Sequence, residues 1–237
     1  MGTRKTTLFN MLAEDSSSKF LREFYQRTAV IYKEAESRSW GDNAIHDDLK
    51  PYYCGQARFA LHQSMFLRLA SECGMKFEVY KCPENGFPIV MVKAGRFFFT
   101  AHYATSPDDS KCLDPSLVRQ QSAMINQSLV QGDLFKPTFD AGKLRGAKSE
   151  SIYANLLHGC RGVGTDFSVA GWVRIAFPHV TNPTASSDAQ MNLVFVENHN
   201  LRDVLSAVVE REKQEGSTRP RIDIAAPKIK KRTENAD

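Results

Sequence analysis

The sequence predicts an α+β fold in which a central mixed or antiparallel β-sheet is flanked by helices. Two regions, at about 76–103 and 151–197, each contain three short apolar or alternating runs separated by turn residues, which is typical of strands. Segments with helical periodicity lie before, between and after them. We therefore expect an N-terminal helical segment (1–50), one α+β core domain (51–216) and a basic tail (217–237) without structure of its own.

The N-terminal segment is predicted to be mainly helical. Residues 1–15 contain a short apolar cluster that fits a helical turn or two. The serines at 16–18 can cap a longer helix. Its apolar side chains recur near one face at helical spacing, and they are Phe20, Leu21, Phe24, Ile31 and Ala35. Residues 36–50 are polar and are predicted to form a loop.

The core domain is predicted to open with a helix between two clear boundary residues. Pro51 suits the first turn of a helix, and Gly74 stands where a left-handed residue would end it. The apolar face between them consists of Ala57, Leu61, Phe66, Leu69 and Cys73.

Three strands are predicted next, in the densest apolar stretch of the chain. They are Lys76–Cys82, Ile89–Val92 and Arg96–Tyr103. Pro83-Glu84-Asn85-Gly86 and Ala94-Gly95 separate them, since Pro presets one corner of a turn and Asn-Gly tolerates positive φ. Aromatic residues on both faces predict an antiparallel meander that is covered from both sides.

A second helix and a second β region follow. Asp114-Pro115 is a strong helix start, and Gly132 is predicted to end that helix. Strands are predicted at 152–158, 167–177 and 192–197. A final amphipathic helix carries apolar residues at i, i+3, i+4, i+7 and i+8, and these are Leu201, Val204, Leu205, Val208 and Val209.

The cysteine pattern and the apolar runs indicate the compartment. The five cysteines are an odd number and form no CxxC motif and no Cys/His set at zinc-ligand spacing, so we expect free thiols rather than disulfides or structural zinc. No apolar run reaches the ~18–20 residues of a membrane span, and the N-terminus lacks the apolar core of a secretory signal. These features predict a cytoplasmic protein that does not enter a membrane.

The predicted element order from residue 51 to 159 is helix, three strands, helix, strand. This order resembles the core of restriction-endonuclease-like (PD-(D/E)xK) nucleases, over less than half of the chain. The resemblance implies a metal site, with an acid opening the second strand and an acid-x-Lys triplet on the strand after or beside it. Neither strand contains an acid, and Glu78 and Lys81 would lie on opposite faces of a strand. A metal-dependent nuclease with a divergent site is thus an alternative hypothesis.

Other local clusters favour structural roles. The glycines between 159 and 164 lie between two strands, whereas a phosphate-binding loop would lead into a helix. His46-Asp47-Asp48 is predicted to be a solvated loop. His158 and Cys160 invite a base–nucleophile interpretation, but no third residue in the sequence orients them. We accordingly predict no catalytic residue, no metal site and no cofactor.

Positive charge is concentrated near the C-terminus. The tail at 217–237 holds six basic and three acidic residues, so it contributes +3 of the net charge of +4 and leaves +1 for the body. A loop at 133–149 adds four basic residues. The predicted nucleic-acid-binding residues are therefore Lys136, Lys143, Arg145, Lys148, Arg219, Arg221, Lys228, Lys230, Lys231 and Arg232.

Charge placement leads to one functional hypothesis and an alternative of another class. We expect a protein that associates with nucleic acid, either DNA or RNA, or that has a regulatory role. It has no catalytic centre of its own and acts through the basic loop and tail. The alternative is a subunit of a protein assembly that docks on a protein partner, or on another copy of itself, through the tail. Ile222, Ile224 and Ile229 are apolar anchors that a purely phosphate-binding arm would not need.

Overall fold

The strands of the two predicted β regions pair into one six-stranded mixed sheet, in the order β1-β2-β3-β6-β7-β8. The computed structural model describes residues 7–82, 86–107, 122–131, 138–139, 151–160, 170–180 and 193–218. The strands of this sheet are β1 (Lys76–Lys81), β2 (Pro88–Ala94), β3 (Phe97–Tyr103), β6 (Ile152–Cys160), β7 (Ala170–Val180) and β8 (Leu193–Asn200). The short strands β4 (Val130–Gln131) and β5 (Thr138–Phe139) form a separate pair.

One parallel pairing joins the two predicted regions. β3 and β6 run parallel, with Phe97 opposite Ile152 and Tyr103 opposite His158, while every other pair in the sheet is antiparallel. In a parallel pair, both strands run in the same direction. The C-terminal ends of β3 and β6 consequently lie side by side at one end of the sheet.

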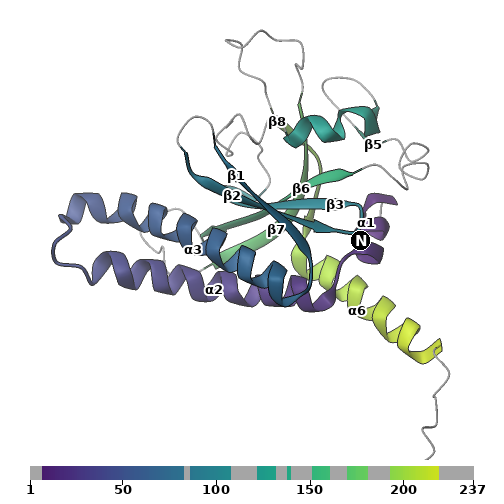
Figure 1. Cartoon of the computed structure of the whole chain (residues 1–237), viewed down its shortest axis with the longest axis horizontal. Helices are drawn as coiled ribbons and strands as arrows, with labels where there is room; N and C mark the ends of the chain where they lie inside the picture. The colour runs from purple at the N-terminus through teal and green to yellow at the C-terminus, as the bar shows by residue number, and fades with distance from the viewer. Residues whose placement is uncertain are drawn as a thin grey trace, which may run out of the picture.

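Helices flank this sheet, which confirms the predicted α+β class (Figure 1). The α-helices of the described part are α1 (Thr7–Asp15), α2 (Ser18–Trp40), α3 (Lys50–Glu72) and α6 (Leu201–Thr218). α2 and α3 pack against each other as a long pair beside the sheet, and the 3₁₀ helix η3 (Met124–Leu129) contacts β6 and β7. A second 3₁₀ helix, η1 (Asp47–Leu49), precedes α3.

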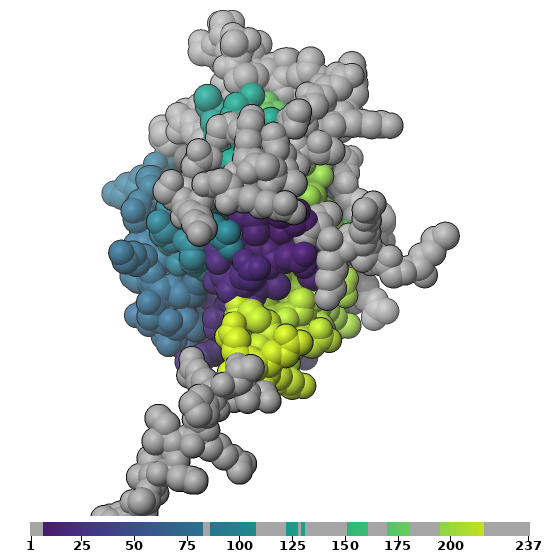
Figure 2. Space-filling model, turned by 90° about the vertical axis from the view of Figure 1, so that its right-hand side faces the viewer, coloured from purple at the N-terminus to yellow at the C-terminus, as the bar shows by residue number. Residues whose placement is uncertain are grey.

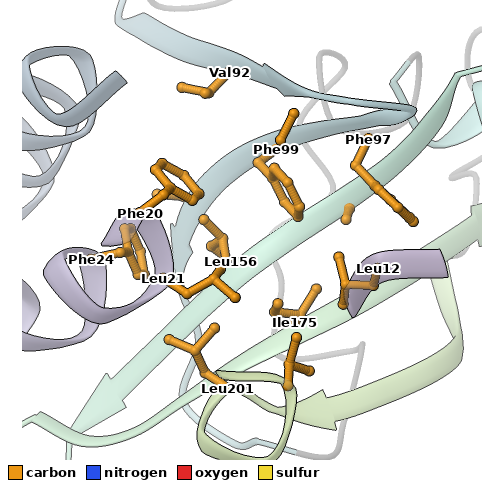
Figure 3. Close-up of a cluster of buried hydrophobic side chains, with 14 of the residues drawn as sticks. Leu12, Phe20, Leu21, Phe24, Val92, Phe97, Phe99, Leu156, Ile175 and Leu201 are labelled. Carbon is orange, nitrogen blue, oxygen red and sulfur yellow. The ribbon is translucent and has the colours of Figure 1, made fainter. Parts of the chain in front are cut away.

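The main core lies between the sheet and helices α1, α2, α3 and α6. Phe20 and Phe24 from α2 pack around Phe66 of α3, with ring centroids 5.9 and 5.7 Å away, and all three are fully buried. Figure 3 shows side chains from helices and strands converging in one layer. Its labelled members are Leu12, Phe20, Leu21, Phe24, Val92, Phe97, Phe99, Leu156, Ile175 and Leu201.

Polar contacts fix the N-terminal helices to the last helix. Glu212 of α6 accepts hydrogen bonds from the backbone N–H of Ser18 (3.0 Å) and from its hydroxyl (2.5 Å), at the N-terminus of α2. Arg211 donates to the carbonyls of Ala13 and Ser16 at the end of α1. A carboxylate suits a helix N-terminus and a cation suits a C-terminus, so both contacts follow the helix dipoles. Figure 2 shows yellow α6 against the purple N-terminal helices.

The β2–β3 turn is held by α1. Gly95 has φ +55°, a left-handed conformation that L side chains rarely adopt, and an added Cβ would meet the Asp15 side chain at 2.6 Å. That close approach lets Asp15 accept from the Arg96 backbone N–H (2.9 Å) and from Arg96 Nε (2.7 Å). The Ala94-Gly95 turn signal thus also sets where α1 docks.

The meander prediction is right in topology and wrong about the cover of its first strand. All six residues of β1 are exposed, whereas β2 and β3 are mostly buried. β1 is the edge of the sheet, so helix α3 covers its neighbour β2 more fully than β1 itself. The alternation along β1 correctly predicts a strand. Its edge position depends on the strand order of the whole sheet, in which β1 pairs with β2 alone among the described strands.

Several predicted boundaries shift. α2 continues to Trp40, where the loop prediction began at residue 36, because Arg38 pairs with Glu34 and the Ser39 hydroxyl donates to the Ala35 carbonyl (2.6 Å). The helix predicted to end at Gly132 gives way to strand β4 at Val130. β7 continues through Pro178 to Val180, with a register shift between Phe177 and Pro178. A shift there accommodates a residue that cannot donate a ladder hydrogen bond.

Within the described ranges, no helix combines the length and the apolar character needed to cross a bilayer.

Candidate functional site

A cavity of about 210 Å³ lies where the N-terminal half of α3 passes the C-terminal ends of β3 and β6. Among its lining residues are Arg58, His62 and Gln63 from α3, Ala101 and Tyr103 from β3, and His158 from β6. We call this space the Arg58 cavity.

Local periodicity presents these side chains to the same space. Cys54, Arg58 and His62 follow one another at four-residue intervals, so they share one face of α3. Tyr103 and His158 are opposite each other in the parallel β3–β6 register and therefore point to the same side of the sheet. The Gln63 amide fixes α3 on the sheet, because it accepts from the Val90 N–H (2.8 Å) and donates to the Ala101 carbonyl (3.2 Å).

Two histidines form a stacked pair at the base of the site. The rings of His62 and His158 are parallel within 6°, with centroids 3.8 Å apart, and both residues are at least 98% buried. Tyr32 of α2 closes the pair, since its ring meets both imidazoles edge-on and its hydroxyl lies 2.9 Å from His158 Nδ1.

Burial keeps both imidazoles neutral. Desolvation lowers the pKa of His62 to about 4, although a hydrogen bond to the Arg58 carbonyl opposes that shift. Desolvation, with the nearby His62 and Arg58, also lowers the pKa of His158 well below its usual value. The carbonyl of Arg58 can only accept, so His62 Nδ1 carries the hydrogen and Nε2 is a lone-pair acceptor. Among the described residues, Nε2 has no hydrogen-bond partner.

Arg58 brings a buried positive charge to the cavity. Arg58 is only 4% exposed. Its guanidinium donates hydrogen bonds to the sulfurs of Cys160 (3.5 Å) and Cys54 (3.6 Å). The guanidinium carbon lies 4.3 Å from the Tyr32 ring centroid and 5.3 Å from that of Tyr103, both within cation–π range. Desolvation acts to lower the pKa of Arg58, but Tyr32 and Cys160 outweigh it and the pKa is raised.

The tyrosines of the site stay protonated at neutral pH. Burial raises the pKa of Tyr32 and is also the main cause of the raised pKa of Tyr103. The cavity wall therefore combines one guanidinium cation with neutral aromatic rings. Such a wall suits an anionic group with a compact apolar or planar body, because a cation and aromatic faces are available together.

The predicted nucleic-acid-binding residues lie outside the described part of the chain. They are Lys136, Lys143, Arg145, Lys148, Arg219, Arg221, Lys228, Lys230, Lys231 and Arg232. The strands that would carry the acids of a nuclease site are β2 and β3, and neither contains an acidic residue. Across the ranges that the structure describes, no three His, Cys, Asp or Glu side chains converge as a metal site.

The local clusters singled out from the sequence have separate positions. His46 lies in an exposed turn and accepts from the Asp48 N–H at 3.4 Å. His102 is buried on the opposite face of the sheet from the Arg58 cavity, with its Nε2 2.6 Å from the Thr100 hydroxyl oxygen. Only His158 and Cys160 belong to the candidate site, and the third residue that organises them is Arg58.

Sequence reasoning missed the contribution of α3. The sequence predicts the apolar face of this helix at Ala57, Leu61 and Phe66, but it assigns no role to the polar series Cys54, Arg58 and His62 beside that face. Polar residues that recur every four positions on a helix with a buried face are a usable signal for an interior polar stripe. The partners on β3, β6 and α2 carry no comparable local signal.

Comparisons with protein-family models, with curated proteins and with solved structures find no match to this chain.

Proposed function

We propose that the protein is a regulatory binding protein that holds a small anionic ligand in the Arg58 cavity, without catalysing its conversion. The observation that carries this proposal is a guanidinium in a residue only 4% exposed that nevertheless lines a cavity. Removing a charge from water is costly, so a buried arginine beside open space favours a role in binding. Arg also offers planar paired donors that match a carboxylate or a phosphate.

The dimensions of the cavity limit the size of the ligand. At about 210 Å³ it exceeds the ~150 Å³ cavity that holds a benzene molecule in a model protein. Tyr103 is 41% exposed and lies at the solvent side, where its ring can cover a planar body. A benzoate-sized carboxylate satisfies the size, the charge and the aromatic wall together.

Calorimetric titration of the full-length protein with benzoate tests this proposal. Benzoate should bind, and neutral benzamide of the same shape should bind at least about tenfold more weakly, because hydrogen bonds to charged groups contribute about 1.5–3 kcal/mol. Arg58→Met should remove this preference, while Arg38→Met, on an exposed arginine of α2, should leave it unchanged. Equal binding of benzoate and benzamide to the unaltered protein would contradict an anion site.

We propose nucleic-acid association in the cytoplasm as a second candidate function, because residues 217–237 contribute +3 of the net charge of +4 and residues 133–149 add four basic side chains. Fluorescence titration with duplex and single-stranded DNA and RNA compares the full chain with a variant ending at residue 218. Loss of the six tail cations should reduce the slope of the logarithm of the binding constant against the logarithm of the salt concentration. The expected reduction is up to about 0.9 per lost phosphate contact. Absence of salt-dependent binding in the full chain would exclude this function.

Assembly through the tail is a separate hypothesis, and light scattering on the full chain and on the shortened variant tests it.

A further inference from the structure

Two cysteines from distant parts of the chain share one guanidinium. Cys54 lies on α3 and Cys160 ends β6, and Arg58 donates to both sulfurs, at 3.6 and 3.5 Å. Both thiols are reduced in the structure. Their common partner is a planar group, so the two sulfurs lie around the same few atoms although 106 positions separate them in sequence.

We infer that Cys160 and Cys54 form a peroxide-sensitive thiol pair, in which Cys160 is oxidised first and Cys54 resolves it. The two positions differ in access. Cys160 is partly exposed, whereas Cys54 is fully buried. A hydroperoxide from solvent therefore meets Cys160, and Cys54 is reached only by the oxidised sulfur of its neighbour.

The surroundings of Cys160 favour the first step. The thiolate is the reacting form of a cysteine, and reactive cysteines occupy electropositive, partly exposed positions. Arg58 supplies the positive charge directly at the sulfur. The strand register shifts between Gly159 and Cys160, so Cys160 stands at an irregular end of the ladder, where a displacement of its sulfur disturbs little regular pairing.

The second step joins the two sulfurs that contact the same guanidinium. The Cys160 thiol releases its proton, the thiolate attacks one oxygen of the hydroperoxide, and the O–O bond breaks. Cys160 becomes a sulfenic acid, and the second oxygen takes up the released proton and leaves as water or an alcohol. The Cys54 sulfur then attacks the Cys160 sulfur, an S–S bond forms and water leaves. In total, two thiols lose two protons and two electrons, and one hydroperoxide takes them up as it is reduced to water and a second water or an alcohol.

Peptide mapping of the oxidised protein tests the pair. The reduced, full-length protein is exposed to limiting hydrogen peroxide, its remaining thiols are alkylated, and a tryptic digest is analysed without reduction. We expect a cross-linked peptide that contains Cys54 and Cys160, and its loss on adding a reductant. Absence of this peptide, or pairing of either residue with another cysteine as the main product, would overturn the inference.

Single substitutions separate the two roles. In Cys54→Ser the reaction should stop at a Cys160 sulfenic acid that dimedone traps, and in Cys160→Ser Cys54 should stay reduced. Cys73 provides a matched control, because it is also partly exposed and burial raises its pKa. Cys73→Ser should form the cross-link as the unaltered protein does. Oxidation of Cys73 as fast as Cys160 in the unaltered protein would show that exposure alone decides reactivity, and would contradict the role of Arg58.

Discussion

Acidification from pH 6.5 to pH 4 is expected to lower the free energy of unfolding by about 3 kcal/mol through His62 alone. His62 has a pKa of about 4 in the folded protein, against an ordinary value of 6.5. The unfolded chain therefore binds the proton at higher pH than the folded one. The stabilising contribution is complete above pH 6.5 and is lost as the pH falls through 4.

The neighbours of His62 reinforce this direction. Arg58 on its own helix is positive, His158 is stacked on it from β6, and Tyr32 meets it edge-on from α2. None of these groups compensates a charge on His62, and a proton on either imidazole opposes a proton on the other. The lowered pKa of His158 adds stability loss of the same sign.

Urea unfolding at several pH values between 4 and 7 measures this effect. His62→Phe keeps an aromatic ring against both Tyr32 and His158 but cannot titrate, so its stability should depend less on pH across this window. His46→Phe is the control, because the His46 side chain is 75% exposed, and it should follow the unaltered protein. A pH dependence of His62→Phe equal to that of the unaltered protein would contradict the assignment.

Replacing Asn126 by alanine is expected to cost about 3 kcal/mol of stability, since it strips partners from three buried backbone groups. The Asn126 amide donates to the carbonyls of Tyr153 (2.9 Å) and Pro178 (2.7 Å) and accepts from the Tyr153 N–H (2.9 Å). Asn126 is fully buried, so water does not replace these bonds. One side chain thus fastens η3 to both β6 and β7.

Chemical unfolding of Asn126→Ala at pH 7 checks this prediction, with a lower midpoint and an unchanged denaturant slope as the expected result. Asn43→Ala, on an exposed loop residue, serves as the matched control and should shift stability by less than about 0.5 kcal/mol. A loss below about 1 kcal/mol for Asn126→Ala would mean that the described hydrogen bonds contribute little net stability.

Elements with a strong local signal were predicted well. Ser17 caps α2 by accepting from the Phe20 N–H, and Gly74 follows α3 with φ +65°, as the cap residues indicated. In β7 the alternation also holds, because Val173, Ile175 and Phe177 are buried while their neighbours Trp172 and Arg174 are partly exposed. Caps and periodicity act over a few residues, so they can be read from the sequence directly.

The candidate site could be predicted only in fragments. His158 and Cys160 are near neighbours in the sequence, but the residue that organises them, Arg58, is 102 positions away from Cys160. Tyr32 is 126 positions from His158. No periodicity links such distant residues, because their contact depends on which strands pair and on which face each helix is packed.

The class of fold, the main helices and strands, and the apolar faces of α2 and β7 follow from the sequence, because each depends on side-chain spacing within one element. The parallel pairing of β3 with β6, the exposed edge position of β1 and the packing of the α2–α3 pair beside the sheet follow only from the tertiary structure. Strand partners are selected by the packing of the whole core rather than by local pattern. That selection alone brings Arg58, His62, His158 and two cysteines together.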